Sequence, residues 1–410
     1  MILMLLRTVY SLILAPLWLI HYAWKTLQNP AYLQGMAQRL GLAQYPQAKI
    51  WIHGVSVGEI NVALILRERI LKNHPNTSIL ITCSTLTAKR LLSKNPLIKH
   101  CYLPVDLPLI IHRFLKTVQP QSVFFIESEL WPNYLFTLQK KKIPLYLMNA
   151  RISDRSYPRM LSMSRLYANL FKCFTSIQPA SDIDRERMLS LGVNDQQLKT
   201  AANLKALGSA PPFSEKTYQQ LITIKPHRSM IVIASTHPNE EALLQEKINT
   251  LAQYHQVVII PRHPHRSLEV KKLFTNSSLY SEGLNPEEPI WIIDQIGLTI
   301  PFFKLANIVI MGGSFVCHGG HNPLEPAYCN VPIITGPHTH NFKELYQQFM
   351  QHHACLQWNT DQLHELIDLD SSTAPWQSLT DNAKKLAEKL NNQAEEALQK
   401  TLLNLSKVIE

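Results

Sequence analysis

The sequence lacks the short motifs that identify several large classes of enzyme and binding protein. No GxGxxG follows the first predicted strand, which argues against a nicotinamide dehydrogenase. There is no P-loop, no HExxH and no GxSxG. Zinc-finger and RNA-binding signatures are missing too, as is a long basic arm, so nucleic acid is not an expected partner.

Residues with metal-ligand spacing are also lacking. The six cysteines are scattered without CxxC spacing, which fits a reducing compartment and argues against a disulfide framework or a zinc site. The 17 histidines include no pair with supporting spacing on a predicted helix, so no metal is expected. Two DxD matches, Asp182-Ile-Asp184 and Asp368-Leu-Asp370, are short enough to arise by chance, and we expect both to face solvent.

The composition describes a globular chain with a basic surplus. Its 410 residues suggest two or three domains, and the apolar share of 46% is enough for proper cores. Lys and Arg outnumber Asp and Glu by 40 to 30, a net charge of +10. A surplus of this size suits acidic partners such as phosphorylated substrates or anionic lipid.

The first 25 residues are unusually apolar. Seventeen uncharged residues lie between Arg7 and Lys25, a length at the short end for a membrane span, and Pro16 interrupts them. No small-x-small cleavage site follows, so we predict a retained membrane anchor over residues 1–25 rather than a signal peptide. Aromatic residues within the run suit a membrane interface: Trp18, Tyr22 and Trp24. Whether the anchor spans the bilayer or lies flat on it is open.

The remainder alternates short apolar runs with helical patterns, which predicts α/β domains with parallel, doubly wound sheets. The predicted strands are 49–53, 78–83, 122–126, 144–148, 230–234, 257–260, 290–293, 307–311 and 331–335. Ser209 to Phe213 is typical of a linker. We therefore predict Rossmann-like domains at 26–205 and 206–410; the helical tail from about Thr373 could pack back on the first domain.

Carboxylates follow two predicted strands of the first domain. Glu59 comes shortly after strand 49–53, and Glu127 and Glu129 come directly after strand 122–126. Sheets of this kind place their ligands at that edge. For Glu59 the alternative is a carboxylate at a helix N-terminus, stabilised by the helix dipole.

In the second half, the stretch 308–326, IVIMGGSFVCHGGHNPLEP, combines a strand, a glycine-rich loop and a helix start. Asn322 is a good N-cap and Pro323 fits the first helical position, so a helix should begin there and attract a phosphate. Glu325 could accept hydrogen bonds from ribose hydroxyls; alternatively it forms a variant capping box with Asn322. Arg262 and His263, after strand 257–260, suit a phosphate or a sugar acid, or else a structural ion pair.

These segments resemble one family. GGSFVxxGGHNPLEPA resembles the nucleotide-binding segment of the Kdo transferases, which move 3-deoxy-D-manno-octulosonic acid from its CMP-activated form onto the lipid A precursor, lipid IVA. HxVSVGE resembles their segment carrying the catalytic base, and Glu59 is its matching carboxylate. Further matches cover most of the chain. The resemblance implies a GT-B fold with a cleft between two domains, inversion, and catalytic domains on the cytoplasmic face of the inner membrane.

The resemblance also implies roles for individual residues. CMP would be bound by Pro261, Arg262, His263, Ile296, Gly297, Leu298, Asn322, Pro323, Leu324 and Glu325. The donor phosphate or sugar acid would meet Lys205, Ser235, Thr236 and His237. The acceptor would meet Ser56, Glu127, Glu129, Arg151 and Arg155. CMP-Kdo is a substrate, and no cofactor is expected. Arg151, Arg155, Arg159 and Arg165 form either a basic wall for glycolipid phosphates or a solvated helix face.

Some positions depart from the family pattern, and two other functions stay open. The departures are Ala88, Ala202, Ala206, Leu207 and Leu298. One alternative is a GT-B transferase or epimerase that uses a UDP-sugar. The other is a catalytically silent, membrane-bound nucleotide- or lipid-binding protein.

Overall fold

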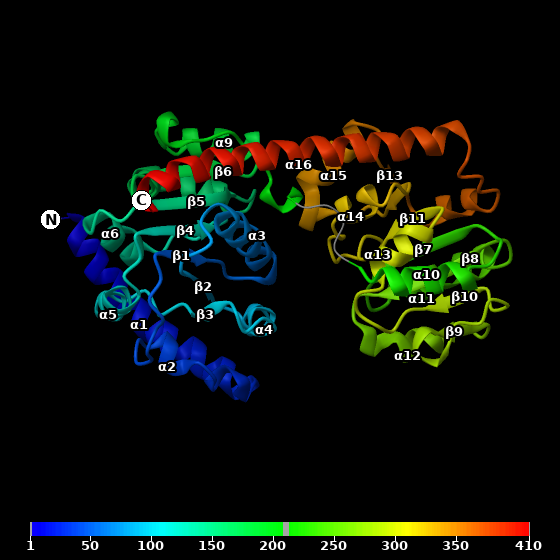
Figure 1. Ribbon diagram of the computed structural model, residues 1–410, viewed down its shortest axis with the longest axis horizontal. Coiled ribbons are helices and arrows are strands. Elements are labelled where there is room, and N and C mark those ends of the chain that lie inside the picture. The colour runs from blue at the N-terminus through cyan, green and yellow to red at the C-terminus, as the bar shows by residue number, and fades with distance from the viewer. Residues whose placement is uncertain (1, 208–212, 410) are drawn as a thin grey trace. The chain divides into compact units, whose positions relative to one another are not determined.

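The computed structural model describes residues 2–207 and 213–409, which divide into two compact α/β units (Figure 1). The first unit ends at Leu207 and also takes in the chain from Asn392 onward; the second lies between these two parts in the sequence. The predicted linker lies outside the described residues except for Phe213.

The first unit is built on a sheet of six parallel strands. They are β1 (Ile50–His53), β2 (Ile79–Cys83), β3 (Lys99–Tyr102), β4 (Ser122–Ile126), β5 (Leu145–Ala150) and β6 (Ser176–Pro179). Their order, β3-β2-β1-β4-β5-β6, is that of a Rossmann fold. The strand order reverses between β1 and β4, so a crevice for ligands is expected beyond the carboxyl ends of these two strands.

Successive residues of each strand pack alternately into two hydrophobic cores, one on each face of this sheet. Ile50 and Ile52 pack with α3, α4 and the end of α16, whereas Trp51 packs with α5, α6, α8 and α9. The helices of the unit are α1 (Ile2–Gln28), α2 (Met36–Arg39), α3 (Val57–Asn73), α4 (Leu86–Ser93), α5 (Pro108–Val118), α6 (Pro132–Lys140), α7 (Tyr157–Ser162), α8 (Ser164–Phe171) and α9 (Asp182–Ser190), with 3-10 turns η1 (Pro30–Leu33), η2 (Asp195–Gln197) and η3 (Leu204–Ala206). Helix α16 (Ala374–Ile409) begins in the second unit and belongs to the first unit from Asn392 onward.

The second unit has a parallel sheet of seven strands in the order β13-β12-β11-β7-β8-β10-β9. The strands are β7 (Met230–Thr236), β8 (Gln256–Pro261), β9 (Ser277–Leu279), β10 (Ile290–Ile292), β11 (Ile308–Met311), β12 (Ile333–Thr335) and β13 (Leu356–Gln357). The helices are α10 (Glu215–Ile224), α11 (Glu240–Leu251), α12 (Ser267–Lys271), α13 (Thr299–Leu305), α14 (Leu324–Tyr328) and α15 (Lys343–Gln351), with η4 (Pro264–Arg266), η5 (Tyr280–Glu282), η6 (His340–Phe342) and η7 (Thr360–Leu366). Here the strand order reverses between β7 and β11.

Helix α1 contacts the first unit through polar side chains. Arg39 donates to the hydroxyl of Tyr22 at 2.6 Å, and Asn133 donates to that of Ser11 at 3.0 Å. One face of α1 instead exposes a row of apolar residues, which we call the apolar stripe: Ile13, Leu17, Ile20, Trp24 and Leu27. Among the described residues, no helix combines the length and apolarity that crossing a bilayer demands. The membrane anchor therefore stays a prediction.

The predicted strands are confirmed with shifts of one or two residues, but β3, β6, β9 and β13 were missed. All four are short; β3 begins with Lys-His and β6 ends in proline, so neither has the expected apolar pattern. The helix predicted at Asn322 begins at Leu324 and has only five residues. Asp184, predicted to face solvent, is buried and accepts a hydrogen bond from the backbone N–H of Ile152 at 2.7 Å.

Candidate active site

Glu59 lies just beyond the carboxyl end of β1, where the strand order reverses, and takes part in the capping of its own helix, α3. Ser56 caps α3, and its hydroxyl donates to Glu59 Oε1 at 2.8 Å, while the N–H of Val55 donates to Oε2 at 2.7 Å. The carboxylate is buried. Burial raises its pKa, against the hydrogen bonds from Val55 and Ser56, and the negative charges of Glu127 and Glu129 raise it further. Glu59 is therefore both a helix cap and a carboxylate more basic than an ordinary glutamate.

Glu127 and Glu129 extend the same edge from β4. Glu127 adopts a left-handed backbone, with φ of +62°, and pairs with Lys205, whose Nζ lies 2.5 Å from Oε1. A Cβ atom on Gly58 would lie 3.7 Å from that Nζ, so Lys205 is also next to the start of α3. Glu129 accepts a hydrogen bond from the Trp131 indole at 2.6 Å. The structure thus groups Lys205 with the carboxylates of the first unit, while Ser235, Thr236 and His237, which were predicted with it, belong to the second unit.

A cavity of about 480 Å³ opens beside Glu127. Arg151 and Arg159 line it together with Ser128, Tyr10 and several apolar side chains. The other two arginines of the predicted basic wall, Arg155 and Arg165, are exposed and do not line it. Carboxylate, guanidinium and apolar surface in one cavity suit a phosphorylated amphiphile better than a purely polar ligand.

In the second unit a buried carboxylate joins the two loops where the strand order reverses. Glu240 accepts hydrogen bonds from the N–H groups of His237 at 3.1 Å, Gly313 at 2.7 Å and Phe315 at 3.0 Å. A Cβ atom on Gly312 would lie 2.8 Å from the Ala234 carbonyl oxygen, which explains the glycine. Glu240 was not predicted as a functional residue, although its place shortly after a predicted strand is the same signal that singled out Glu59.

The segment Asn322–Glu325 differs from the predicted helix start. Asn322 Oδ1 accepts from the N–H of Leu324, two residues along, at 3.2 Å, so the variant capping box does not form. A five-residue helix has a weak dipole, so its electrostatic attraction for a phosphate is expected to be weaker than that of a longer helix. Pro323 and Leu324 are buried. Glu325 makes no hydrogen bond within the described residues; burial raises its pKa, and the positive charge of Arg262 opposes that rise.

Histidine rings lie against the glycine loop. His237 Nε2 lies 2.9 Å from His321 Nε2, and the ring centre of His237 lies 3.6 Å from that of His318. Burial, together with the neighbouring histidines and Arg262, lowers the pKa of His237 to about 3 and that of His321 to about 4. Within the described residues, no group of three or more His, Cys, Asp or Glu is arranged to hold a metal.

The other predicted donor residues lie around this loop with differing exposure. Arg262 is exposed and forms no ion pair within the described residues; the structural pair is made instead by Arg266, which binds Glu241 at 2.9 and 3.0 Å. His263 is exposed, whereas Pro261 and Thr236 are buried. Ile296 is exposed, Gly297 has a φ of +92°, and Leu298 is buried, so Leu298 could meet a ligand only through its backbone.

Two parallel α/β units of this kind are shared with solved glycosyltransferases. A glycosyltransferase from Rickettsia africae ESF-5 aligns over 89% of this chain and 100% of its own, with a TM-score of 0.55 and 12% identity. At that identity the likeness concerns the fold alone, which is GT-B-like. The cleft predicted between the two domains stays a prediction.

Sequence relatives show the family. Residues 34–207 match the family model described as 3-deoxy-D-manno-octulosonic-acid transferase (kdotransferase). The 3-deoxy-D-manno-octulosonic acid transferase of Haemophilus influenzae is 31% identical, over 97% of this chain and 95% of its own. That of Rickettsia prowazekii is 33% identical, over 85% and 78%. The chain belongs to the 3-deoxy-D-manno-octulosonic acid (Kdo) transferase family of glycosyltransferases.

Proposed function

We propose that this protein transfers Kdo from CMP-Kdo to the lipid A precursor, lipid IVA, with inversion at the anomeric carbon. The observation that carries the proposal is Glu59, a buried carboxylate with a raised pKa at the crevice edge of the first unit. A base of this kind can take the proton of the acceptor hydroxyl while the bond to CMP breaks. A raised pKa favours this role because the proton is then accepted more readily.

The second unit would bind the donor. Arg262 supplies an exposed guanidinium without an ion pair in the described residues, suited to the phosphate or the sugar carboxylate. Glu325 offers an acceptor for the ribose hydroxyls. CMP gains negative charge as it departs. Fixed basic groups stabilise this charge in the transition state, so the proposed step uses no metal.

The acceptor would lie in the cavity lined by Glu127, Arg151 and Arg159. Its phosphates match the guanidinium groups, and its lipid portion requires access to a membrane. We therefore place the protein at the inner membrane with its catalytic units on the cytoplasmic face.

The proposal is tested by incubating the full chain with CMP-Kdo and lipid IVA and weighing the product by mass spectrometry. We expect a mass increase of one or more whole Kdo residues. Turnover with a UDP-sugar instead of CMP-Kdo would favour the UDP-sugar transferase or epimerase. Binding of CMP or lipid without any product would favour the catalytically silent binding protein.

Glu325→Ala is expected to weaken CMP binding by roughly 1–3 kcal/mol, because the ribose hydroxyls would lose a buried acceptor. Calorimetric titration with CMP measures this effect. Glu365→Ala, which removes an exposed carboxylate from the same unit, is the control and should leave the affinity unchanged. Equal CMP affinity in wild type and Glu325→Ala would show that Glu325 does not contact the nucleotide.

The apolar stripe of α1 is expected to hold the protein at the membrane. Leu17→Ser with Trp24→Ser should shift the protein from the membrane fraction towards the supernatant, because each substitution removes large apolar area from the interface. Point variants are preferable to deletion of α1, which would also strip Arg39 and Asn133 of hydrogen-bond partners. Unchanged sedimentation with membranes would exclude the stripe as the anchor.

A further inference from the structure

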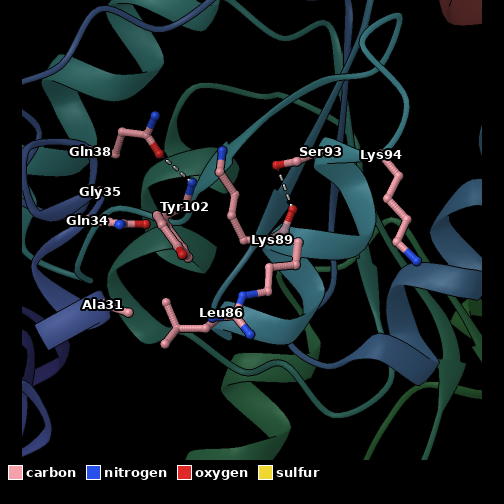
Figure 2. Close-up of a pocket in the computed structure, with 10 residues that line it drawn as sticks. Ala31, Gln34, Gly35, Gln38, Leu86, Lys89, Ser93, Lys94 and Tyr102 are labelled. Carbon is pink, nitrogen blue, oxygen red and sulfur yellow. Dashed lines mark hydrogen bonds between the residues drawn. The ribbon is translucent and has the colours of Figure 1, made fainter. Parts of the chain in front are cut away.

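A second cavity of the first unit, separate from the Glu127 cavity, lies between α4 and the segment that follows α1. Its volume is about 450 Å³, within the range of small-ligand pockets. Figure 2 shows its walls: the α1–α2 segment from Ala31 to Gln38 and the helix α4, with the Tyr102 ring between them. A hydrogen bond of 3.0 Å from the N–H of Tyr102 to Gln38 Oε1 joins the first wall to the end of β3.

A glycine allows this close approach. Gly35 has a φ of +79°, and a Cβ atom there would lie 2.2 Å from the Tyr102 ring. Arg39 covers the same ring at 3.8 Å, while it donates to the Ser84 carbonyl at 2.9 Å. The shape of the cavity is therefore fixed by the backbone conformation of Gly35 and by the contacts that Arg39 makes with Tyr102 and Ser84.

The charge of the cavity has one sign. Lys89, Arg90 and Lys94 line it, and no Asp or Glu does. None of the three forms an ion pair within the described residues; Lys89 Nζ lies 5.4 Å from the Tyr102 ring centre and donates weakly to the His100 carbonyl at 3.4 Å. Burial lowers the pKa of Lys89, and the positive charge of Arg39 lowers it as well. A half-buried cation without a counter-ion gains from a bound anion.

The place of the cavity indicates where the anion comes from. Its first wall begins three residues after α1, whose apolar stripe ends in the exposed Trp24 and Leu27. Leu33, within the segment that forms the first wall, is exposed as well. A basic cavity beside exposed apolar side chains matches the chemistry of a phospholipid: acyl chains next to a phosphate.

We propose that Lys89 and Arg90 form a binding site for the phosphate of an anionic phospholipid headgroup, distinct from the sites for donor and acceptor. Lys94 contributes long-range attraction, since Figure 2 shows its side chain directed away from Tyr102. The site would fix the first unit on the bilayer surface by polar contact, in addition to the apolar stripe.

The test compares flotation of the full chain with phosphatidylcholine vesicles with and without phosphatidylglycerol. Phosphatidylglycerol should increase binding of the wild type, and Lys89→Gln with Arg90→Gln should weaken that increase by about tenfold or more, the effect of two basic side chains near an anionic surface. The control is Lys140→Gln with Lys141→Gln, which removes the same charge from exposed positions of the same unit. The circular dichroism spectrum and the thermal unfolding midpoint should be unchanged in both variants, which establishes that the substituted first unit is folded in each.

Two results would overturn the proposal. An equal loss of binding in the control would mean that net charge, and not the cavity, attracts the lipid. Unchanged binding of Lys89→Gln with Arg90→Gln would exclude the site altogether. The source of the phosphate is tested by calorimetry with glycerol 3-phosphate, for which we expect no saturable binding below millimolar concentration. Tight binding of this soluble ester would assign the cavity to a soluble metabolite and overturn the lipid assignment.

Discussion

Glu59→Gln is expected to slow Kdo transfer by at least about 10²–10⁴-fold, because glutamine cannot take the acceptor's proton. The substitution is close to isosteric, and glutamine also completes a capping box, so α3 should keep its N-terminus. CMP affinity should stay within about threefold, since the proposed donor contacts lie in the second unit and are untouched. The measurements are the transfer rate onto lipid IVA and the dissociation constant for CMP.

The pH dependence gives a second readout for Glu59. A general base must be deprotonated, so wild-type activity should fall as pH falls through the raised pKa of Glu59. Glu59→Gln should lose that limb of the profile. The control, Glu68→Gln, changes an exposed carboxylate on the same helix and should leave both the rate and the profile intact. If the rate of Glu59→Gln survives, Glu127 or Glu129 becomes the candidate base; if rate and CMP affinity collapse together, Glu59 is a structural carboxylate.

Glu240→Ala is expected to have the largest effect on the second unit. Three backbone N–H groups, of His237, Gly313 and Phe315, would lose their acceptor in a buried place. Unsatisfied buried groups cost about 1–3 kcal/mol each, so the free energy of unfolding should fall by at least about 3 kcal/mol. CMP affinity should fall too, because the loop leading to Asn322 and Glu325 would lose its two hydrogen bonds to the start of α11. Denaturant titration and calorimetry measure the two effects.

The pH dependence of this loss has a definite sign. Burial raises the pKa of Glu240 above its ordinary value, against the three hydrogen bonds, so its ionised form is less favourable in the folded state than in the unfolded chain. Stability of the wild type should therefore decline as pH rises from the ordinary to the raised pKa, and Glu240→Ala should lack that decline. Glu246→Ala, an exposed change on the same helix, is the control. A variant as stable as this control would show that water or a shifted loop satisfies the three groups.

Most of the fold could be predicted because its signals are local. Buried parallel strands are continuous β-branched runs, and nine of them were found from that pattern alone. The edge strands were missed because they are short and their sequences are not continuous apolar runs. β3 starts with Lys-His, β6 reads Ser-Ile-Gln-Pro, and β9 reads Ser-Ser-Leu.

The candidate site could be predicted only in part. The capping contact between Ser56 and Glu59 spans three residues and is therefore written in the local sequence. The ion pair between Lys205 and Glu127 joins residues that are far apart in the sequence, and no sequence pattern predicts it. The same holds for Glu240 and Gly313, which meet only because β7 and β11 are neighbours in the sheet.

The sequence by itself determined which segments become most of the strands and helices, that the sheets are parallel, and to which family the chain belongs. The strands and helices depend on the local hydrophobic pattern, and the family is recognised from short sequence motifs. The tertiary structure decided which charges are buried. Asp184 was predicted to face solvent, yet packing buries it, and Arg266 is buried as well; each then requires a hydrogen-bonding partner. It also lowers the pKa of His237 and His321, because their neighbours come within contact only in the folded sheet.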